Sequence, residues 1–385
     1  MIKRDIFSPS DDRFRLHVAA FLDSEIAPHY SVWESTGRIP RDAWLKAGAA
    51  GLLCRTAPAL HGGHDAPFTE AVVIAEELAK RRFAGFLTFL QSDIVAPYFL
   101  KLATDSQKQA YIPDLCSGAK LGAIAMTEQQ SGSEIQYMKT AFTRRADGFS
   151  ISGEKKHISN GFSADVILVA ARRANLPSGG DPQLSLLIVD GGTPGLSREP
   201  IPKSGMRALD TSKIVLDNCI VGDDKLLGAE GRGLFYLLTF LGLERLMLAI
   251  YAQASATAIL QELVTFCTER KTSTGCLLDY QTNYCRLADL YAECSVNQSF
   301  IDACIIAQAR GKHDPKASSL AKLRATETLK SIAVLAVQLR GAQGISDGMG
   351  ARVTQDVVDS CVQSIWGGAS ETLRDAIGRS LVNSI

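Results

Sequence analysis

The spacing of apolar residues changes character twice along the chain. From residue 11 to about residue 120, apolar positions such as Phe14 and Val18 recur every three or four residues, which is typical of amphipathic helices. Thr104 or Asp105 is the expected N-cap of a later helix in this block. The first block is therefore predicted to be helical.

From residue 121 to about residue 227 the pattern consists of short β-rich runs separated by turn residues. Asp147-Gly148 lies between two such runs, 140–145 and 149–152, and predicts a hairpin. Further strands are expected at 166–171, 184–189 and 213–216. We expect a compact antiparallel β domain here.

Long helical patterns return after Gly233. Their lengths suit a helical bundle, and they cover 233–270, 279–309, 318–339 and a last segment near 370–381. The predicted fold class is α+β. Its predicted domains are a helical N-terminal domain (1–120), a β-barrel-like middle domain (121–227) and a C-terminal four-helix-bundle domain (228–385).

Composition excludes several classes of partner. The 41 basic residues balance 41 acidic ones, so the chain lacks the basic excess of a nucleic-acid binder and has no general attraction to an anionic membrane surface. The most apolar stretch, 234–243, is too short to span a bilayer. Nine cysteines without a CxxC pair indicate a reduced chain, and with no secretory signal visible we expect a cytoplasmic protein. His61 and His64 lack a third ligand, so no metal site is expected.

Glu244 is the candidate catalytic residue that stands out on physical grounds. On a helix it falls within an apolar stripe, where burial would raise its pKa and suit it to act as a general base. The alternative is a structural ion pair, with Arg245 or with a more distant base. The stripe consists of Leu237, Phe240, Leu241, Met247 and Leu248.

Two segments of small residues allow a ligand to approach the backbone closely. One is Met126-Thr127-Glu128, followed by Ser131-Gly132-Ser133, and the other runs from Gln338 to Gly344 after a predicted helix. Loops of this kind are common. The second segment does not follow a strand, so it is not a dinucleotide-binding fingerprint.

Taken in order, several segments resemble motifs of the acyl-CoA dehydrogenase family along essentially the whole chain. The segments are Thr104 to Gly118, Ala125 to Glu128 with Gly132-Ser133-Glu134, Gly153 to Gly161, Lys203 to Arg207 with Leu227 to Gly233, Glu269 to Gln281, and Gln338 to Gly344. Some positions depart from the family pattern and suggest a specialised member. They are Glu134, His157, Ser273-Thr274, Val358 and Ala369.

The resemblance implies an FAD enzyme that removes hydrogen from Cα and Cβ of an acyl thioester. A carboxylate takes the α-proton while hydride leaves Cβ for flavin N5, and electrons then pass to an acceptor, typically an electron-transferring flavoprotein. A homotetramer is usual, and a dimer is the alternative. The thioester is carried by CoA or by an acyl carrier protein.

The resemblance also bears on the base. Most members carry it near the C-terminus, where this chain has Gly367. The isovaleryl-CoA and long-chain branches carry it in a Leu-Glu-Arg segment on an earlier helix, and this chain has Glu244 in such a segment. Glu371 is a rival close to the first position. Because the helical pattern and the resemblance select the same residue, Glu244 is the predicted base.

The remaining site residues follow from position in the family pattern. Flavin-ring contacts are expected from Met126, Thr127, His157 and Ser159, and a contact with the thioester arm or cofactor from Ser133. The adenine end of an FAD bound mainly to a neighbouring subunit would meet Arg270, Gln338, Gly341 and Ala342. Substrate contacts are expected from Leu241, Arg245 and Gly367, and Gln91, Ser92 and Asp93 lie near the acyl pocket or else cap a helix.

Two other functions remain open on the sequence alone. One is an oxygen-using flavin oxidase or hydroxylase on the same fold. The other is a non-catalytic partner subunit of a heteromeric dehydrogenase, which the altered cofactor motifs suggest.

Overall fold

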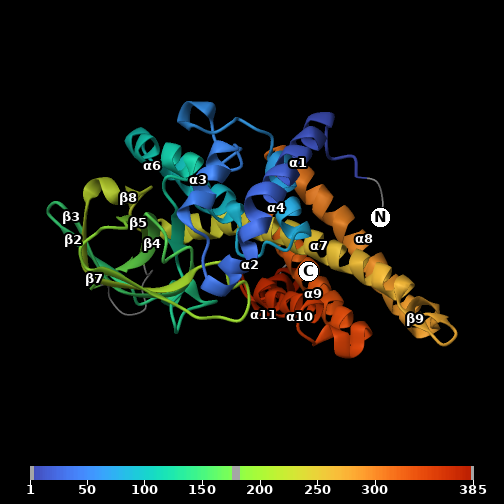
Figure 1. Ribbon diagram of the computed structural model, residues 1–385. Coiled ribbons are helices and arrows are strands. Elements are labelled where there is room, and N and C mark those ends of the chain that lie inside the picture. The colour runs from blue at the N-terminus through green and yellow to red at the C-terminus, as the bar shows by residue number, and fades with distance from the viewer. Residues whose placement is uncertain (1–3, 176–182, 383–385) are drawn as a thin grey trace.

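The computed structural model describes residues 4–175 and 183–382 of the chain. Helices form its N-terminal and C-terminal parts, and a sheet lies between them in the sequence and at one end of the molecule (Figure 1). This arrangement confirms the predicted α+β fold class. The predicted domain boundaries at 120/121 and 227/228 stay predictions.

The N-terminal part is helical, as its apolar spacing predicts. Thr104 is the N-cap of the last of these helices, because its hydroxyl accepts a hydrogen bond from the Gln107 amide (3.3 Å) while the Gln107 side chain accepts one from the Thr104 amide (2.9 Å). Gly118, with φ of 76°, ends that helix. The helices are α1 (Pro9–Phe21), α2 (Ala27–Thr36), α3 (Arg41–Ala49), α4 (Phe68–Lys80), α5 (Ala96–Leu102) and α6 (Asp105–Ser117).

Gln91, Ser92 and Asp93 lie inside a π-helical segment, Leu90–Val95, that leads into α5. All three are buried inside this segment, and neither the segment, whose N-cap is Phe89, nor α5, whose N-cap is Val95, has a side-chain cap, so the helix-capping interpretation of these residues is wrong. The side-chain nitrogen of Gln91 donates a hydrogen bond to the Leu115 carbonyl (2.7 Å), and its side-chain oxygen accepts one from the backbone amide of Gly122 (3.1 Å). Gln91 therefore joins the end of α6 to the first strand, and the expectation that these residues lie near an acyl pocket stays a prediction.

The middle sheet is mixed rather than wholly antiparallel. Its strand order is β6-β7-β3-β2-β4-β5-β8, and β1 pairs with β4. β1 and β2 both run parallel to β4, so these two strands point the same way, and the loop 126–140 connects them without forming a hairpin. The hairpin predicted at Asp147-Gly148 joins β2 to β3. The strands are β1 (Gly122–Ala125), β2 (Ala141–Arg145), β3 (Gly148–Ser159), β4 (Val166–Arg173), β5 (Leu184–Asp190), β6 (Leu196–Pro200), β7 (Thr211–Gly222) and β8 (Leu226–Leu227).

The C-terminal part contains the long helices expected from the sequence. They are α7 (Gly233–Glu269), α8 (Gln281–Ala309), α9 (Pro315–Arg340) and α11 (Ser370–Val382), with a short hairpin of β9 (Lys271–Thr272) and β10 (Gly275–Cys276) after α7. A further helix that the sequence analysis did not predict, α10 (Met349–Gln363), lies between α9 and α11. Helices α7 and α9 run parallel: Arg245 contacts Ser319 near their beginnings, and the Arg340 guanidinium lies over the Phe266 ring near their ends.

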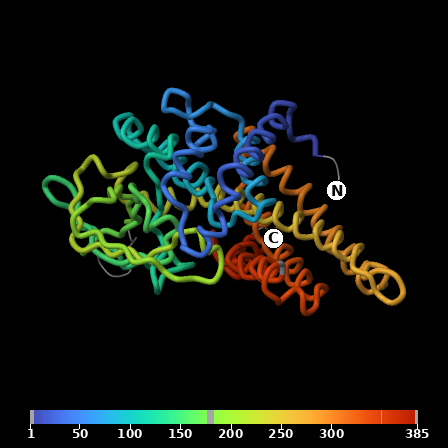
Figure 2. Tube along the Cα trace, viewed as in Figure 1, coloured from blue at the N-terminus to red at the C-terminus, as the bar shows by residue number. Residues whose placement is uncertain are grey.

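Helix α7 extends from the sheet to the far end of the bundle (Figures 1 and 2). It packs against α4, α8 and α9, which explains why apolar residues surround much of it. By length and composition alone this 37-residue helix could cross a membrane, a test that the core helix of a globular protein also passes. The expectation of no span rested on the shorter run 234–243.

Candidate active site

Glu244 lies on α7, close to the segment that joins α10 to α11. Its side chain is partly buried, and burial raises the pKa of its carboxyl to about 7 against the opposing attraction of Arg245 and Lys322. Among the described residues, none donates a hydrogen bond to this carboxylate. Glu244 is thus an unpaired carboxylate poised to exchange a proton near neutral pH. Leu241, one turn earlier, is partly buried as well.

Gly367, in the segment between α10 and α11, lies next to the Glu244 side chain. A Cβ atom at this glycine would lie 3.4 Å from Glu244 Oε1 and 2.3 Å from Leu248 Cδ1, and φ is 61°. Residue 367 and Glu244 therefore converge on one point in space although 123 positions separate them. Glu371 is different: it lies at the start of α11 with a side chain 84% exposed and 3.4 Å from Arg374.

Two cations hold the backbone beside Glu244. Arg245 Nε donates to the Gly367 carbonyl (3.1 Å), and its Nη1 donates to Ser319 Oγ (3.1 Å). Lys322 on α9 is fully buried, and its Nζ donates to the Gly368 carbonyl (2.8 Å). Burial lowers the pKa of Lys322 to about 8, so the ammonium still prevails at neutral pH.

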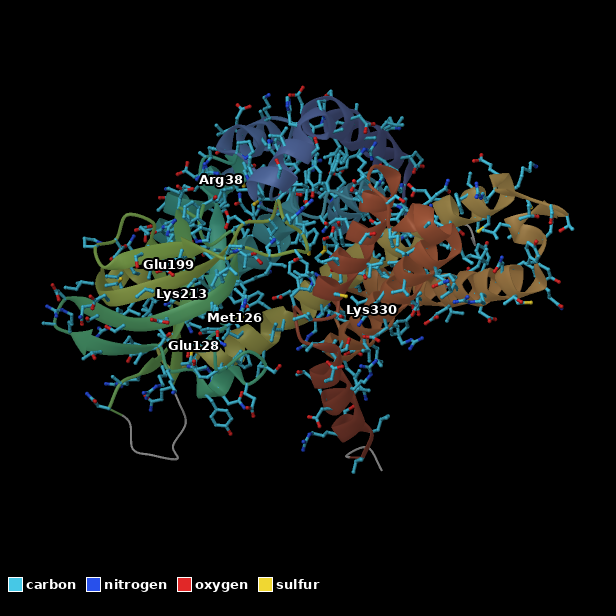
Figure 3. The ribbon with its side chains drawn as sticks, turned by 60° about the horizontal axis from the view of Figure 1, so that its bottom comes forward. Arg38, Met126, Glu128, Glu199, Lys213 and Lys330 are labelled. Carbon is cyan, nitrogen blue, oxygen red and sulfur yellow. The ribbon has the colours of Figure 1, made fainter. Side chains whose placement is uncertain are left out.

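Met126 and Thr127 follow β1 and are partly exposed. Their carbonyls accept hydrogen bonds from β3: Lys155 Nζ donates to Met126 O (3.0 Å) and the Lys156 amide donates to Thr127 O (2.9 Å). The end of β1 is thereby fixed against β3. Figure 3 shows Met126 and Glu128 together at the sheet.

Glu128 and Lys155 form a buried ion pair at 3.0 Å that the sequence did not lead us to select. The Glu128 carboxylate also accepts hydrogen bonds from the amides of Lys139 (2.6 Å) and Thr140 (2.9 Å), and its pKa is lowered although burial opposes this. The pair therefore closes the 126–140 loop. The sequence contains one indication that Lys155 is buried. Alternate residues of a strand face the same side, and Lys155 lies at an even spacing from Phe149 and Ile151, which face inward from β3.

The predicted flavin-ring residues on β3 lie at an irregularity in the sheet. The β3–β7 register shifts between Lys155 and Ile158, and His157 within the shift has φ of 59°. The His157 side chain is exposed and that of Ser159 is partly buried. Both residues lie two to four positions beyond Lys155, which donates to the Met126 carbonyl, so the structure gathers these candidates near the end of β1.

Ser133 belongs to the loop after β1 and reaches the C-terminal part. Its exposed side chain accepts a hydrogen bond from the Thr372 hydroxyl of α11 at 3.0 Å. This contact brings the loop that carries Met126 and Thr127 next to the helix that follows Gly367 and Gly368.

The four residues expected at the adenine end of FAD lie at the opposite end of α7. Arg270 is 26 positions beyond Glu244, which corresponds to about 39 Å along a helix. Gln338, Gly341 and Ala342 lie at the end of α9, which runs parallel to α7, and all four residues are exposed. The adjoining β9 is far from the sheet in Figure 1. Within one chain, the adenine-end candidates and Glu244 therefore lie at opposite ends of the bundle.

A surface cavity of about 510 Å³ lies elsewhere, between α6 and the β4–β5 side of the sheet. Its cations are already engaged, since Lys225 pairs with Asp190 (2.7 Å) and Arg198 donates to the Ala164 and Gly191 carbonyls (2.7 and 2.9 Å). Glu244 does not line this cavity, which therefore has no part in the candidate active site.

The chain matches known proteins over nearly its full length. The models of the acyl-CoA dehydrogenase N-terminal, middle and C-terminal domains match residues 8–119, 123–219 and 231–382. Long-chain specific acyl-CoA dehydrogenase from Mus musculus is 33% identical over 99% of this chain and 88% of that protein. Isovaleryl-CoA dehydrogenase from Oryza sativa subsp. japonica is 29% identical over 98% of this chain and 92% of that protein.

A solved structure shows the same likeness in three dimensions. The crystal structure of an acyl-CoA dehydrogenase from Geobacillus kaustophilus superposes with a TM-score of 0.95, at 34% identity, and covers 98% of this chain and 100% of that one. The chain therefore belongs to the acyl-CoA dehydrogenase family, whose members are FAD-dependent oxidoreductases that act on CH–CH bonds.

Proposed function

We propose that this enzyme dehydrogenates an acyl thioester between Cα and Cβ, with Glu244 as the base that takes the α-proton. The observation that carries the proposal is the unpaired Glu244 carboxylate, partly buried beside Gly367, whose pKa is raised to about 7. A base must be deprotonated yet able to hold a proton, and a pKa near the working pH meets both needs.

The residues around β1 and β3 fit a flat polar ring. The Lys155–Glu128 pair fixes the backbone at Met126 and Thr127, and the irregularity at His157 leaves an accessible edge beside them. At the far end of the bundle, Gly341 has φ of 58° and no other atom within 4 Å of a Cβ built there, which allows a ligand to approach the backbone. FAD, when bound, supplies the acceptor for the hydride that leaves Cβ.

The protein's own part is to position the thioester and to move one proton. Glu244 accepts the α-proton at a carboxylate oxygen, and Arg245 and Lys322 keep this carboxylate in an electropositive surrounding. Ser133, held by Thr372, and Leu241 are proposed substrate contacts, together with Arg245 and the backbone at Gly367. The thioester carrier, CoA or an acyl carrier protein, stays open.

The assembly follows from the separation along α7. Because Arg270 and Glu244 lie about 39 Å apart on one helix, we propose that each site takes its adenine-end residues from a neighbouring subunit, in a homotetramer or dimer. An electron-transferring flavoprotein is the proposed electron acceptor, and the cytoplasm is the proposed location.

Glu244→Gln tests the function directly, with Glu371→Gln as the matched control on an exposed carboxylate. In anaerobic titrations with a panel of acyl-CoAs and acyl-carrier proteins, the wild type and the Glu371 variant should lose flavin absorbance, while the Glu244 variant should keep its FAD without bleaching. Bleaching of the Glu244 variant at the wild-type rate would remove Glu244 as base. Fast reoxidation of the bleached enzyme by air would favour an oxidase, and a chain purified without FAD would favour the non-catalytic subunit.

A further inference from the structure

The Gly367–Gly368 segment approaches Glu244 with backbone alone. At both glycines φ is positive, 61° and 101°, and a Cβ at Gly368 would lie 3.3 Å from Arg245 Nη2. Without side chains, the segment has no packing contacts of its own that would fix the direction of its peptide groups. Its carbonyl oxygens, if turned toward the Glu244 carboxylate, would repel it.

Both carbonyl oxygens instead accept hydrogen bonds from cations on two different helices, the partly buried Arg245 and the fully buried Lys322. Arg245 on α7 binds the Gly367 oxygen (3.1 Å) and Lys322 on α9 binds the Gly368 oxygen (2.8 Å). Ser319 and Lys322 lie one turn apart on the same face of α9, and Ser319 accepts from Arg245 Nη1, so the two cations form one connected cluster.

Lys322 is unusual within this cluster. It is fully buried, and the Gly368 carbonyl is the one hydrogen-bond partner that its ammonium has among the described residues. Burying an ammonium group is costly, and a single carbonyl does not offset that cost. The nearby charges are those of Arg245, Glu244, Glu327 and Glu371, which lie on α7, α9 and α11.

We propose that Lys322 is a positioning residue of this active site: it fixes the Gly368 carbonyl and supplies the positive field that keeps the Glu244 carboxylate ready to accept a proton. The proposal rests on Glu244 as the base. Groups that face Glu244 from the surrounding helices are Arg245 on α7, Lys322 on α9 and the Tyr98 phenol on α5. Arg245 and Lys322 both combine a charge with a backbone contact on the Gly367–Gly368 segment, and Lys322 is the one of the two that is fully buried.

Three substitutions separate the contact from the charge. Lys322→Met removes both, Lys322→Gln keeps a donor for the Gly368 carbonyl but removes the charge, and Lys322→Arg keeps both. Lys330→Met is the matched control, because Lys330 is exposed on the same helix (Figure 3). Each variant is purified with FAD, and flavin bleaching by the best acyl thioester is followed across pH.

Lys322→Met should slow bleaching up to about 100-fold at saturating substrate with little change in KM, because a small misplacement of the base acts on the proton-transfer step. Removing a cation favours the protonated form of Glu244. The acid limb, which is the rise of the bleaching rate on the acid side of the pH profile, should therefore move to higher pH by about one unit in both the Met and the Gln variants. Lys322→Arg should restore the wild-type pH profile, and Lys330→Met should match the wild type.

A Lys322→Met enzyme with wild-type rate and pH profile would overturn the proposal. If that variant does not fold, Lys322→Gln decides, and an unshifted acid limb there would overturn the role of the charge. Failure of this inference differs from failure of the proposed function: in the first case Glu244→Gln is inactive while the Lys322 variants behave as wild type, and in the second Glu244→Gln itself bleaches.

Discussion

Replacing Gly367 by alanine adds one methyl group at the point where Glu244 and Leu248 meet. The new Cβ would lie 2.3 Å from Leu248 Cδ1, about 1.2–1.7 Å closer than an ordinary carbon contact. The φ of 61° adds a left-handed conformation that costs an L-residue about 1–2 kcal/mol. Overpacking of a filled site costs about 1–3 kcal/mol more, so Gly367→Ala should lower the free energy of unfolding by about 2–5 kcal/mol.

The same methyl group should slow catalysis. It would lie 3.4 Å from Glu244 Oε1, and Glu244 and Leu248 lie one turn apart on α7, so we expect a backbone shift that relieves the Leu248 overlap to displace the carboxylate as well. A displacement near 1 Å can reduce a rate about 100-fold, and we expect bleaching to slow by about 10- to 100-fold. Denaturant unfolding and anaerobic stopped-flow bleaching measure the two effects.

Two further variants make the reasoning refutable. In a Leu248→Ala background the overlap is gone, and Gly367→Ala should then cost only the conformational part, about 1–2 kcal/mol. Gly378→Ala on α11 is the control: no atom lies within 4 Å of its Cβ, and it should be neutral or stabilising by about 0.5–1 kcal/mol. An equal cost of Gly367→Ala in both backgrounds, or a wild-type bleaching rate, would refute the argument.

Three other results are expected. Lys155→Met leaves the buried Glu128 carboxylate unpaired, so it should destabilise the protein by about 3–5 kcal/mol and weaken FAD retention, and a thermal midpoint equal to that of the wild type would contradict this. The bleaching rate should rise with pH and be half-maximal near pH 7, because only the deprotonated Glu244, whose pKa is raised to about 7, accepts the α-proton; a flat profile between pH 6 and 8 would contradict it. Refolding inactive Glu244→Gln chains together with inactive Arg270→Glu chains should restore roughly a quarter of the wild-type activity, because half of the dimers then contain both kinds of chain and hold one complete site out of two. A mixture that stays inactive would exclude sites shared between subunits.

The sequence could predict Glu244 as the candidate base because the directions of side chains repeat at a fixed period along a helix. An acid among Leu237, Phe240 and Leu241 must lie on the same face as these residues wherever the helix packs. The long α7 and the hairpin between β2 and β3 were predictable for the same reason, since both depend on local spacing. The parallel pairing of β1 with β4 depends on chain reversals far apart in the sequence, and no local pattern encodes it.

The two buried lysines show where local patterns fail. Lys155 and Lys322 are each fully buried, yet lysine is ordinarily a surface residue, and Lys155 even lies between the polar residues Glu154 and Lys156 in the sequence. Their partners, Glu128 and the Gly368 carbonyl, lie 27 and 46 positions away. Only the assembled fold brings these groups within hydrogen-bond distance.

Helix α7 carries the proposed base and leads to the residues that we propose to contact the FAD of a neighbouring subunit. It carries Glu244 near its beginning and leads to Arg270 just past its end, and α9 runs beside it from Lys322 to Gln338 and Gly341. A continuous helix keeps its two ends at a constant separation, so in the proposed assembly the base and the proposed adenine-end residues of one chain would serve two different sites. On this proposal, the rigid helix that positions Glu244 as the base is also the reason why a lone subunit would lack a complete site.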